Sequence, residues 1–126
     1  MHILDVIPPD EYADHITDSI YTNSVAILSL QYAIDAAQLL GYNEQYADSV
    51  TEWTDVSRRI VTIVAQNSNG VWHPEYEGYN LYKVKQADVI MLGYPLGINF
   101  ANMTRQVGDG PYILYILYAV VSCIIV

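Results

Sequence analysis

Two neighbouring carboxyl groups, Asp10 and Glu11, follow a pair of prolines in the run IPPDEYADHITDSIYTN, residues 7–23. The prolines restrict the backbone, so we expect the two acids on a stiff loop that leads into a helix. A rigidly held carboxylic acid can protonate the leaving oxygen of an acetal if burial or a nearby negative charge keeps its own proton on. Asp10 could supply that charge to Glu11. Acidic residues that merely precede or cap a helix give the same pattern, so both interpretations stay open.

A second carboxylate would be needed to activate water on the opposite face of the sugar ring. Glu75 and Glu77 flank one tyrosine in the run GVWHPEYEGYNLYKV, so in an extended segment both would point to the same side. They are candidates for that base, with ordinary loop residues as the alternative. The spacing of His15 and His73 is not that of metal ligands, and we predict no metal site there.

The elements that would position these groups are mainly helices. The segment Asp18–Leu40 has helical composition and is followed by Gly41, which suits the end of a helix. Its apolar residues form two stripes at helical spacing, so we expect neighbours on two sides, as in a multi-helix array. One stripe holds Ile27, Leu30, Ile34 and Ala37, and the other holds Val25, Leu28, Tyr32, Ala36 and Leu39.

A second helix is predicted over Asn43–Gln66, with a charged and solvated face on which Asp55 and Arg59 pair four residues apart. The run NSNG at residues 67–70 ends this helix. A long ordered loop that includes short strands is predicted next, and a short helix then runs from Lys85 or Gln86 to a point before Pro95.

Composition excludes some functions. The 126 residues carry a net charge of −9, which argues against nucleic acid and anionic membrane surfaces as partners. The single cysteine, Cys123, cannot form an internal disulfide or a cysteine-built zinc site. The N-terminus lacks the features of a secretory signal, so a complete chain would start in the cytosol. The apolar run 111–126 is shorter than the about 20 residues that span a membrane.

Two motifs, PPDEYADHITDSIYTN and, about seventy residues later, VKQADVIMLGYPL, resemble glycoside hydrolase family 65. By this resemblance Glu11 matches the general acid, and Lys85 and Gln86 match residues that hydrogen-bond the glucosyl unit. Tyr12, Tyr21 and Asn23 match pattern positions as well; for these we expect packing and capping around the loop.

The resemblance also implies an all-α fold, because the family's catalytic domain is an (α/α)6 barrel several times longer than this chain. Residues 1–98 would form part of that domain, and residues 99–126 would be a divergent apolar tail. We therefore expect an incomplete and inactive portion of an enzyme, poorly folded when alone.

The implied activity is hydrolysis of an α-glucosidic bond with inversion, without a cofactor, by means of a base outside this chain. The implied carbohydrate substrate is glucosylgalactosyl-hydroxylysine or an α-glucoside such as trehalose. Two alternatives remain open. One is a disaccharide phosphorylase of the same family, and the other is a non-catalytic protein that uses its apolar tail for membrane or partner association.

Overall fold

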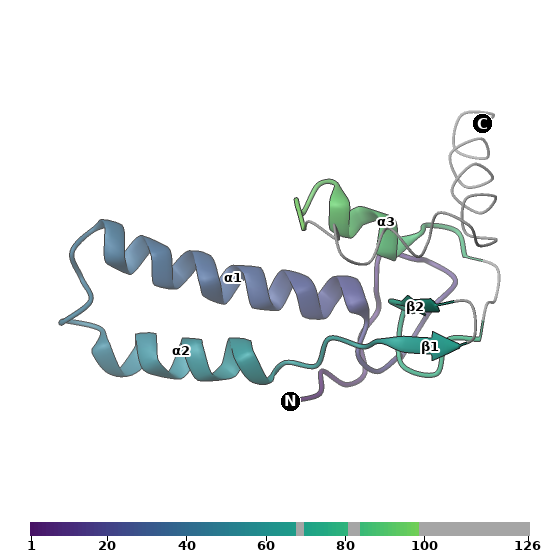
Figure 1. Ribbon diagram of the computed structural model, residues 1–126, viewed down its shortest axis with the longest axis horizontal. Coiled ribbons are helices and arrows are strands. Elements are labelled where there is room, and N and C mark those ends of the chain that lie inside the picture. Colours follow the sequence, from purple (N-terminus) through teal and green to yellow (C-terminus); the bar gives the residue numbers. More distant parts are fainter. Residues whose placement is uncertain (68–69, 81–83, 99–126) are drawn as a thin grey trace.

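The computed structural model describes residues 1–67, 70–80 and 84–98. In chain order these contain α1 (Ile20–Leu39), α2 (Ala47–Arg59), β1 (Ala65–Asn67), β2 (Gly70–Trp72) and α3 (Asp88–Gly93). The long helices α1 and α2 lie side by side and antiparallel, and α3 lies along the N-terminal part of α1 (Figure 1). The arrangement is mostly helical, as predicted, with one short antiparallel hairpin of β1 and β2.

Helix α1 ends at the predicted glycine and begins two residues later than predicted. The hydroxyl of Ser19 accepts a hydrogen bond from the backbone N–H of Thr22 at 3.2 Å and caps the first turn. At the other end Gly41 adopts a φ of +72°, and the backbone N–H of Tyr42 donates to the carbonyl of Ala37 at 2.8 Å. This is a Schellman ending, which requires a left-handed residue and therefore favours glycine.

The prediction for the second helix is wrong at its C-terminal end, because α2 stops at Arg59 and not at Gln66. The next five residues are β-branched, and such side chains favour an extended backbone. Tertiary hydrogen bonds hold them extended. The N–H of Val61 donates to the carbonyl of Met1 at 3.0 Å, and the carbonyl of Val61 accepts from the side chain of Asn23 at 2.8 Å.

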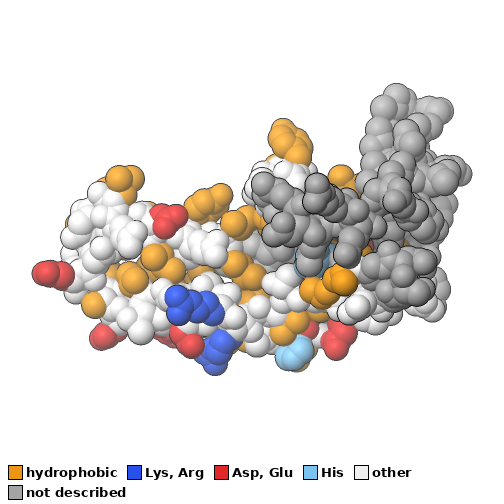
Figure 2. All heavy atoms as spheres, viewed as in Figure 1, with side chains coloured by type: hydrophobic (Ala, Val, Ile, Leu, Met, Phe, Trp, Pro, Cys, Tyr) orange, Lys and Arg blue, Asp and Glu red, His pale blue; other side chains and the backbone are white. Residues whose placement is uncertain are grey.

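The apolar surface of α1 is only partly covered by the described residues. Ile20 and Leu92 are each 1% exposed and line the same hollow where α3 meets α1. Val25, Tyr32 and Leu39, from the second predicted stripe, are 37%, 64% and 88% exposed. Figure 2 shows apolar side chains at the surface along both long helices. Within the described part of the chain, α1 therefore has two neighbours, α2 along it and α3 at its N-terminal part, but much of its second stripe stays exposed.

The solvated face predicted for α2 is confirmed, because Asp55 and Arg59 form an ion pair and both side chains are more than half exposed. The prediction for the tail 99–126 lies outside the described residues. Among the residues that are described, no helix has the length and apolar character needed to cross a membrane.

Candidate active site

The acidic loop that contains Asp10 and Glu11 is closed at its base by a contact between Val6 and Ile16. Val6 and Ile16 exchange two backbone hydrogen bonds of 3.0 Å as an antiparallel bridge, and the loop leaves and returns through this pair. At its tip the N–H of Ala13 donates to the carbonyl of Asp10 at 2.9 Å. The two residues between them are therefore the central residues of a turn, and such positions project outward. Glu11 is one of them, and its side chain is 62% exposed.

The structure brings together the three site residues that the sequence predicts. The Lys85 ammonium Nζ lies 2.5 Å from Oε2 of Glu11, and the Gln86 amide Nε2 donates to Oε1 of Glu11 at 3.4 Å. The backbone N–H of Glu11 donates in turn to Oε1 of Gln86 at 3.3 Å. Residues 74 positions apart in the chain thus form one polar cluster, which we call the acid–lysine–glutamine cluster.

The charge state of Glu11 differs from the expectation for a proton donor. The hydrogen bond from Lys85, followed by the hydrogen bond from Gln86 and the charge of Lys85, holds the pKa of Glu11 below its ordinary value. The same contact raises the pKa of Lys85. In this geometry Glu11 is an ionised, exposed carboxylate, so the neighbouring Asp10 does not dominate its titration as the sequence suggested.

Asp10 has a different role from the one predicted for it. Its side chain is 3% exposed, and its Oδ1 accepts backbone hydrogen bonds from Tyr12 at 3.2 Å, Lys85 at 2.8 Å and Gln86 at 3.3 Å. Sequence reasoning missed this role. The sequence indicates only the local part of this role, because aspartate side chains commonly accept a hydrogen bond from the backbone N–H two residues later, here that of Tyr12.

A pair of buried carboxyl groups lies behind the loop. Glu75 is 7% and Asp88 is 1% exposed, and Oε2 of Glu75 accepts the N–H of Val89 in the first turn of α3 at 3.2 Å. Burial, and then the charges of Asp88 and Asp10, raise the pKa of Glu75 to about 8. Burial and the charge of Asp10 raise the pKa of Asp88 to about 7. The carboxyl groups of Glu75 and Asp88, which lie behind the loop, therefore tend to keep their protons near neutral pH.

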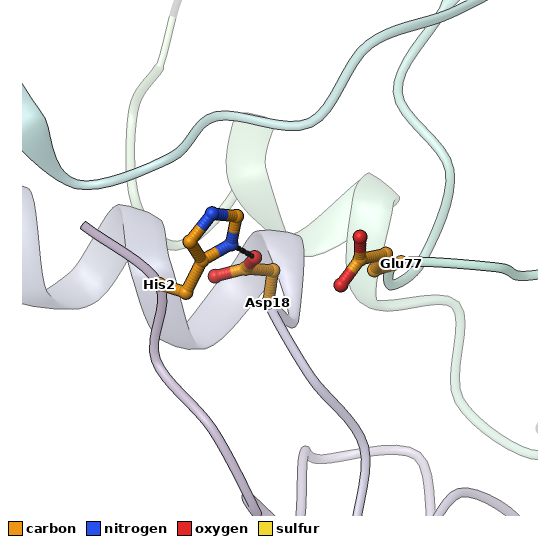
Figure 3. A group of neighbouring side chains, drawn as sticks. All are labelled: His2, Asp18 and Glu77. Atoms are coloured by element: carbon orange, nitrogen blue, oxygen red, sulfur yellow. Dashed lines mark hydrogen bonds and ion pairs between the residues drawn. The ribbon is translucent and has the colours of Figure 1, made fainter.

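Glu75 and Glu77 do not share one environment, which corrects the expectation for an extended segment. The chain turns at these residues, so that Glu75 is buried and Glu77 is exposed. There its carboxylate faces His2 and Asp18, with candidate ligand atoms of the three within 4.8 Å of one another (Figure 3).

Two members of the group in Figure 3, His2 and Asp18, bond to each other within the chain. Oδ2 of Asp18 lies 2.5 Å from Nδ1 of His2, and Oδ1 accepts from the N–H of Ile3 and the amide of Asn23, both at 2.9 Å. Both oxygens of Asp18 thus tie the first residues to the start of α1. The packing role expected for Asn23 is confirmed, since it is 1% exposed, whereas Tyr12 is 61% exposed.

The two other histidines have local partners. Nδ1 of His15 lies 2.5 Å from a carboxylate oxygen of Asp5, and this contact raises the pKa of His15. Nδ1 of His73 lies 2.6 Å from the carbonyl of Ile63. His73 also lines a mainly apolar cavity of about 400 Å³ between α1 and α3, together with Ile20, Ser24, Ile27, Leu28 and Leu92, among others.

Comparison with known proteins gives these residues a context. Residues 1–83 match the glycosyl hydrolase family 65 central catalytic domain. The chain is 36% identical to the protein-glucosylgalactosylhydroxylysine glucosidase of Dictyostelium discoideum, over 80% of this chain and 14% of that protein. The corresponding Danio rerio glucosidase is 41% identical, over 83% of this chain and 15% of its own length.

A cell wall acid trehalase of Candida albicans is 30% identical, over 90% of this chain and 11% of that protein. The chain therefore spans about one seventh or less of the length of these relatives. The described helices are consistent with part of an (α/α)6 catalytic domain. Because the match to this family's central catalytic domain covers residues 1–83, the chain belongs to glycosyl hydrolase family 65 and represents part of that domain.

Proposed function

We propose that this chain carries the general acid and part of the glucose-binding subsite of a glycosidase that hydrolyses an α-glucosidic bond with inversion. The observation that supports this is the contact of Glu11 with Lys85 and Gln86 at the tip of a closed loop. A carboxyl group and two side chains that can donate hydrogen bonds to sugar hydroxyls, Lys85 and Gln86, are thus in direct contact.

Sugar binding would change the partners of these groups. The hydroxyl oxygens of a glucosyl unit accept hydrogen bonds, so Lys85 and Gln86 can donate to them in place of Glu11. Once the Lys85 ammonium turns to the sugar, Glu11 loses the contact that lowers its pKa. Enclosure by the rest of a barrel would raise that pKa further, so that the carboxyl group keeps its proton until the bond breaks.

In the reaction, Glu11 gives its proton to the glycosidic oxygen as the bond from that oxygen to the anomeric carbon breaks. Water attacks the anomeric carbon from the opposite face and gives its proton to a carboxylate base, which produces inversion. We place that base outside this chain. The buried Glu75 already binds α3, and the exposed Glu77 faces His2 and Asp18.

The relatives suggest the substrate. Two are glucosylgalactosylhydroxylysine glucosidases and one is an acid trehalase. We therefore propose glucose release from glucosylgalactosyl-hydroxylysine first, and from trehalose second.

A chimera tests the proposal. The segment of the Danio rerio glucosidase that matches this chain is replaced by residues 1–98, and glucose release is measured with and without Glu11→Gln. We expect kcat to fall about 10²- to 10⁴-fold, the usual contribution of a positioned acid. Lys85→Ala should act mainly on KM. Glu44→Gln, the same change at an exposed position after α1, is the control and should leave both constants unchanged.

An active chimera whose turnover is undiminished by Glu11→Gln would refute the role of Glu11. The product also identifies the reaction. Glucose formed without added phosphate supports hydrolysis, whereas phosphate-dependent glucose 1-phosphate would establish the phosphorylase alternative.

A further inference from the structure

Asp10 stands out because one buried oxygen atom joins two distant parts of the chain. Its Oδ1 accepts the N–H of Tyr12, which follows Glu11, and the N–H groups of Lys85 and Gln86. The carboxyl group is 3% exposed, whereas Glu11 beside it projects into solvent. Both halves of the acid–lysine–glutamine cluster are thus held by their backbones to the same atom.

The visible ion pair cannot hold this arrangement alone. The side chains of Glu11 and Lys85 are 62% and 46% exposed, and exposed ion pairs contribute little because solvent and side-chain entropy oppose them. Hydrogen bonds from backbone N–H groups to a buried carboxylate are charge-assisted and are stronger than neutral ones. They also fix backbones, which in turn limits where the side chains can reach.

We propose that Asp10 is the positioning residue of the site, whose side chain clamps the backbone of residues 85–86 to the acid loop and so sets Glu11 against Lys85 and Gln86. Only the catalytic consequence of the clamp rests on the proposed function; the clamp itself does not. Asp10 is buried behind the residues that would meet the sugar, and it acts through the three residues that it aligns.

The surroundings explain why aspartate is suited to this place. Three charged or titratable groups lie near enough to interact with the charge of Asp10. They are the carboxyl group of Glu75, the carboxyl group of Asp88 at the start of α3, and the ammonium group of Lys85. An asparagine would keep one neutral acceptor oxygen for the three donors. An alanine would leave the N–H groups of Lys85 and Gln86 without this acceptor, and a glutamate would displace it by one methylene group.

The test uses the complete 126-residue chain and two nuclear magnetic resonance measurements. The first is hydrogen exchange at the amides of Lys85 and Gln86 in the wild type, Asp10→Ala and Asp10→Asn. We expect exchange about tenfold to a hundredfold faster in Asp10→Ala, the range for losing a bond to a charged acceptor, with Asp10→Asn in between. Asp14→Asn, in the same loop but largely exposed, is the control and should leave these rates unchanged.

The second measurement is the titration of the Glu11 carboxyl group, which a role in general stability would not move. Asp10→Ala should shift the Glu11 pKa upward, in the same direction as Lys85→Met does, because both end the contact with the ammonium group. Amide signals of α1 report that each variant is folded. If Asp10→Ala loses them, Asp10→Asn carries the test, because its side chain has the same size.

The proposal is overturned if a folded Asp10 variant keeps wild-type exchange at Lys85 and Gln86, or if Glu11 titrates as in the wild type. Neither readout involves turnover, so failure of the clamp is distinguishable from failure of the proposed activity. In the active chimera, Asp10→Asn should lower kcat less than Glu11→Gln does, and an equal or larger loss would contradict a purely positioning role.

Discussion

The buried carboxyl group of Glu75 should make this chain less stable as the pH rises. A carboxyl group whose pKa is raised in the folded state binds a proton that the unfolded chain has already released. Between the ordinary pKa of 4.5 and the folded value of about 8, the folded state therefore holds more protons, and the free energy of unfolding falls with increasing pH.

The size of the effect follows from that interval. One group contributes a slope of about 1.4 kcal/mol per pH unit inside the interval, which gives an upper bound of roughly 5 kcal/mol across it. Asp88, with a folded pKa of about 7, contributes in the same direction. Because the groups interact and water relaxes around them, we expect an observed loss on the order of 2 kcal/mol from about pH 5 to pH 8. The lowered pKa of Asp18 acts only at more acid pH, where stability is lost as the pH falls.

The perturbation is Glu75→Gln, which keeps the size of the side chain and an oxygen to accept the N–H of Val89. Urea unfolding of the complete chain is followed by circular dichroism at several values between about pH 5 and pH 8. The variant should lose about half of the wild-type slope, because Asp88 still titrates. Glu77→Gln, two residues away and exposed, is the matched control and should keep the wild-type slope.

Two results would refute the reasoning. A wild-type stability that stays constant or rises across this pH range would show that Glu75 and Asp88 are not proton-holding groups in the folded chain. A Glu75→Gln slope equal to that of the wild type would show that the effect comes from other residues.

Two further predictions concern stability. Gly41→Ala should cost about 1 kcal/mol of stability by conformational strain alone, because Gly41 has a φ of +72° and an added methyl group would meet nothing within 4 Å. Gly93→Ala, where there is equal space and no positive φ, should be neutral or slightly stabilising. Equal effects of the two substitutions in urea unfolding would contradict the strain argument. Leu92→Ala should cost about 2–5 kcal/mol of stability, because Leu92 is 1% exposed. Leu39→Ala, at a position that is 88% exposed, should change stability by less than about 0.5 kcal/mol. Similar losses for the two variants in thermal unfolding would show that the contact of α3 with α1 is not formed.

Local sequence predicted those features whose causes are themselves local. The end of α1 depends on a glycine with positive φ, and the solvated face of α2 depends on charges at helical spacing. Each of these features depends on residues within about one or two helical turns, so a pattern in the sequence is sufficient. The pairing of Glu11 with Lys85 and Gln86 was inferred from resemblance to a family, since nothing in the spacing requires contact between residues 74 positions apart.

The sequence by itself thus determined the presence of the two long helices, the glycine end of α1 and the family of the chain. Only the tertiary structure decided which of two adjacent acids faces inward, that Glu75 is buried while Glu77 is exposed, and that α2 stops at Arg59. The physical reason is the same in each case. Hydrogen bonds to distant backbone groups set the outcome, and adjacent residues with similar local propensities cannot reveal where those groups will lie.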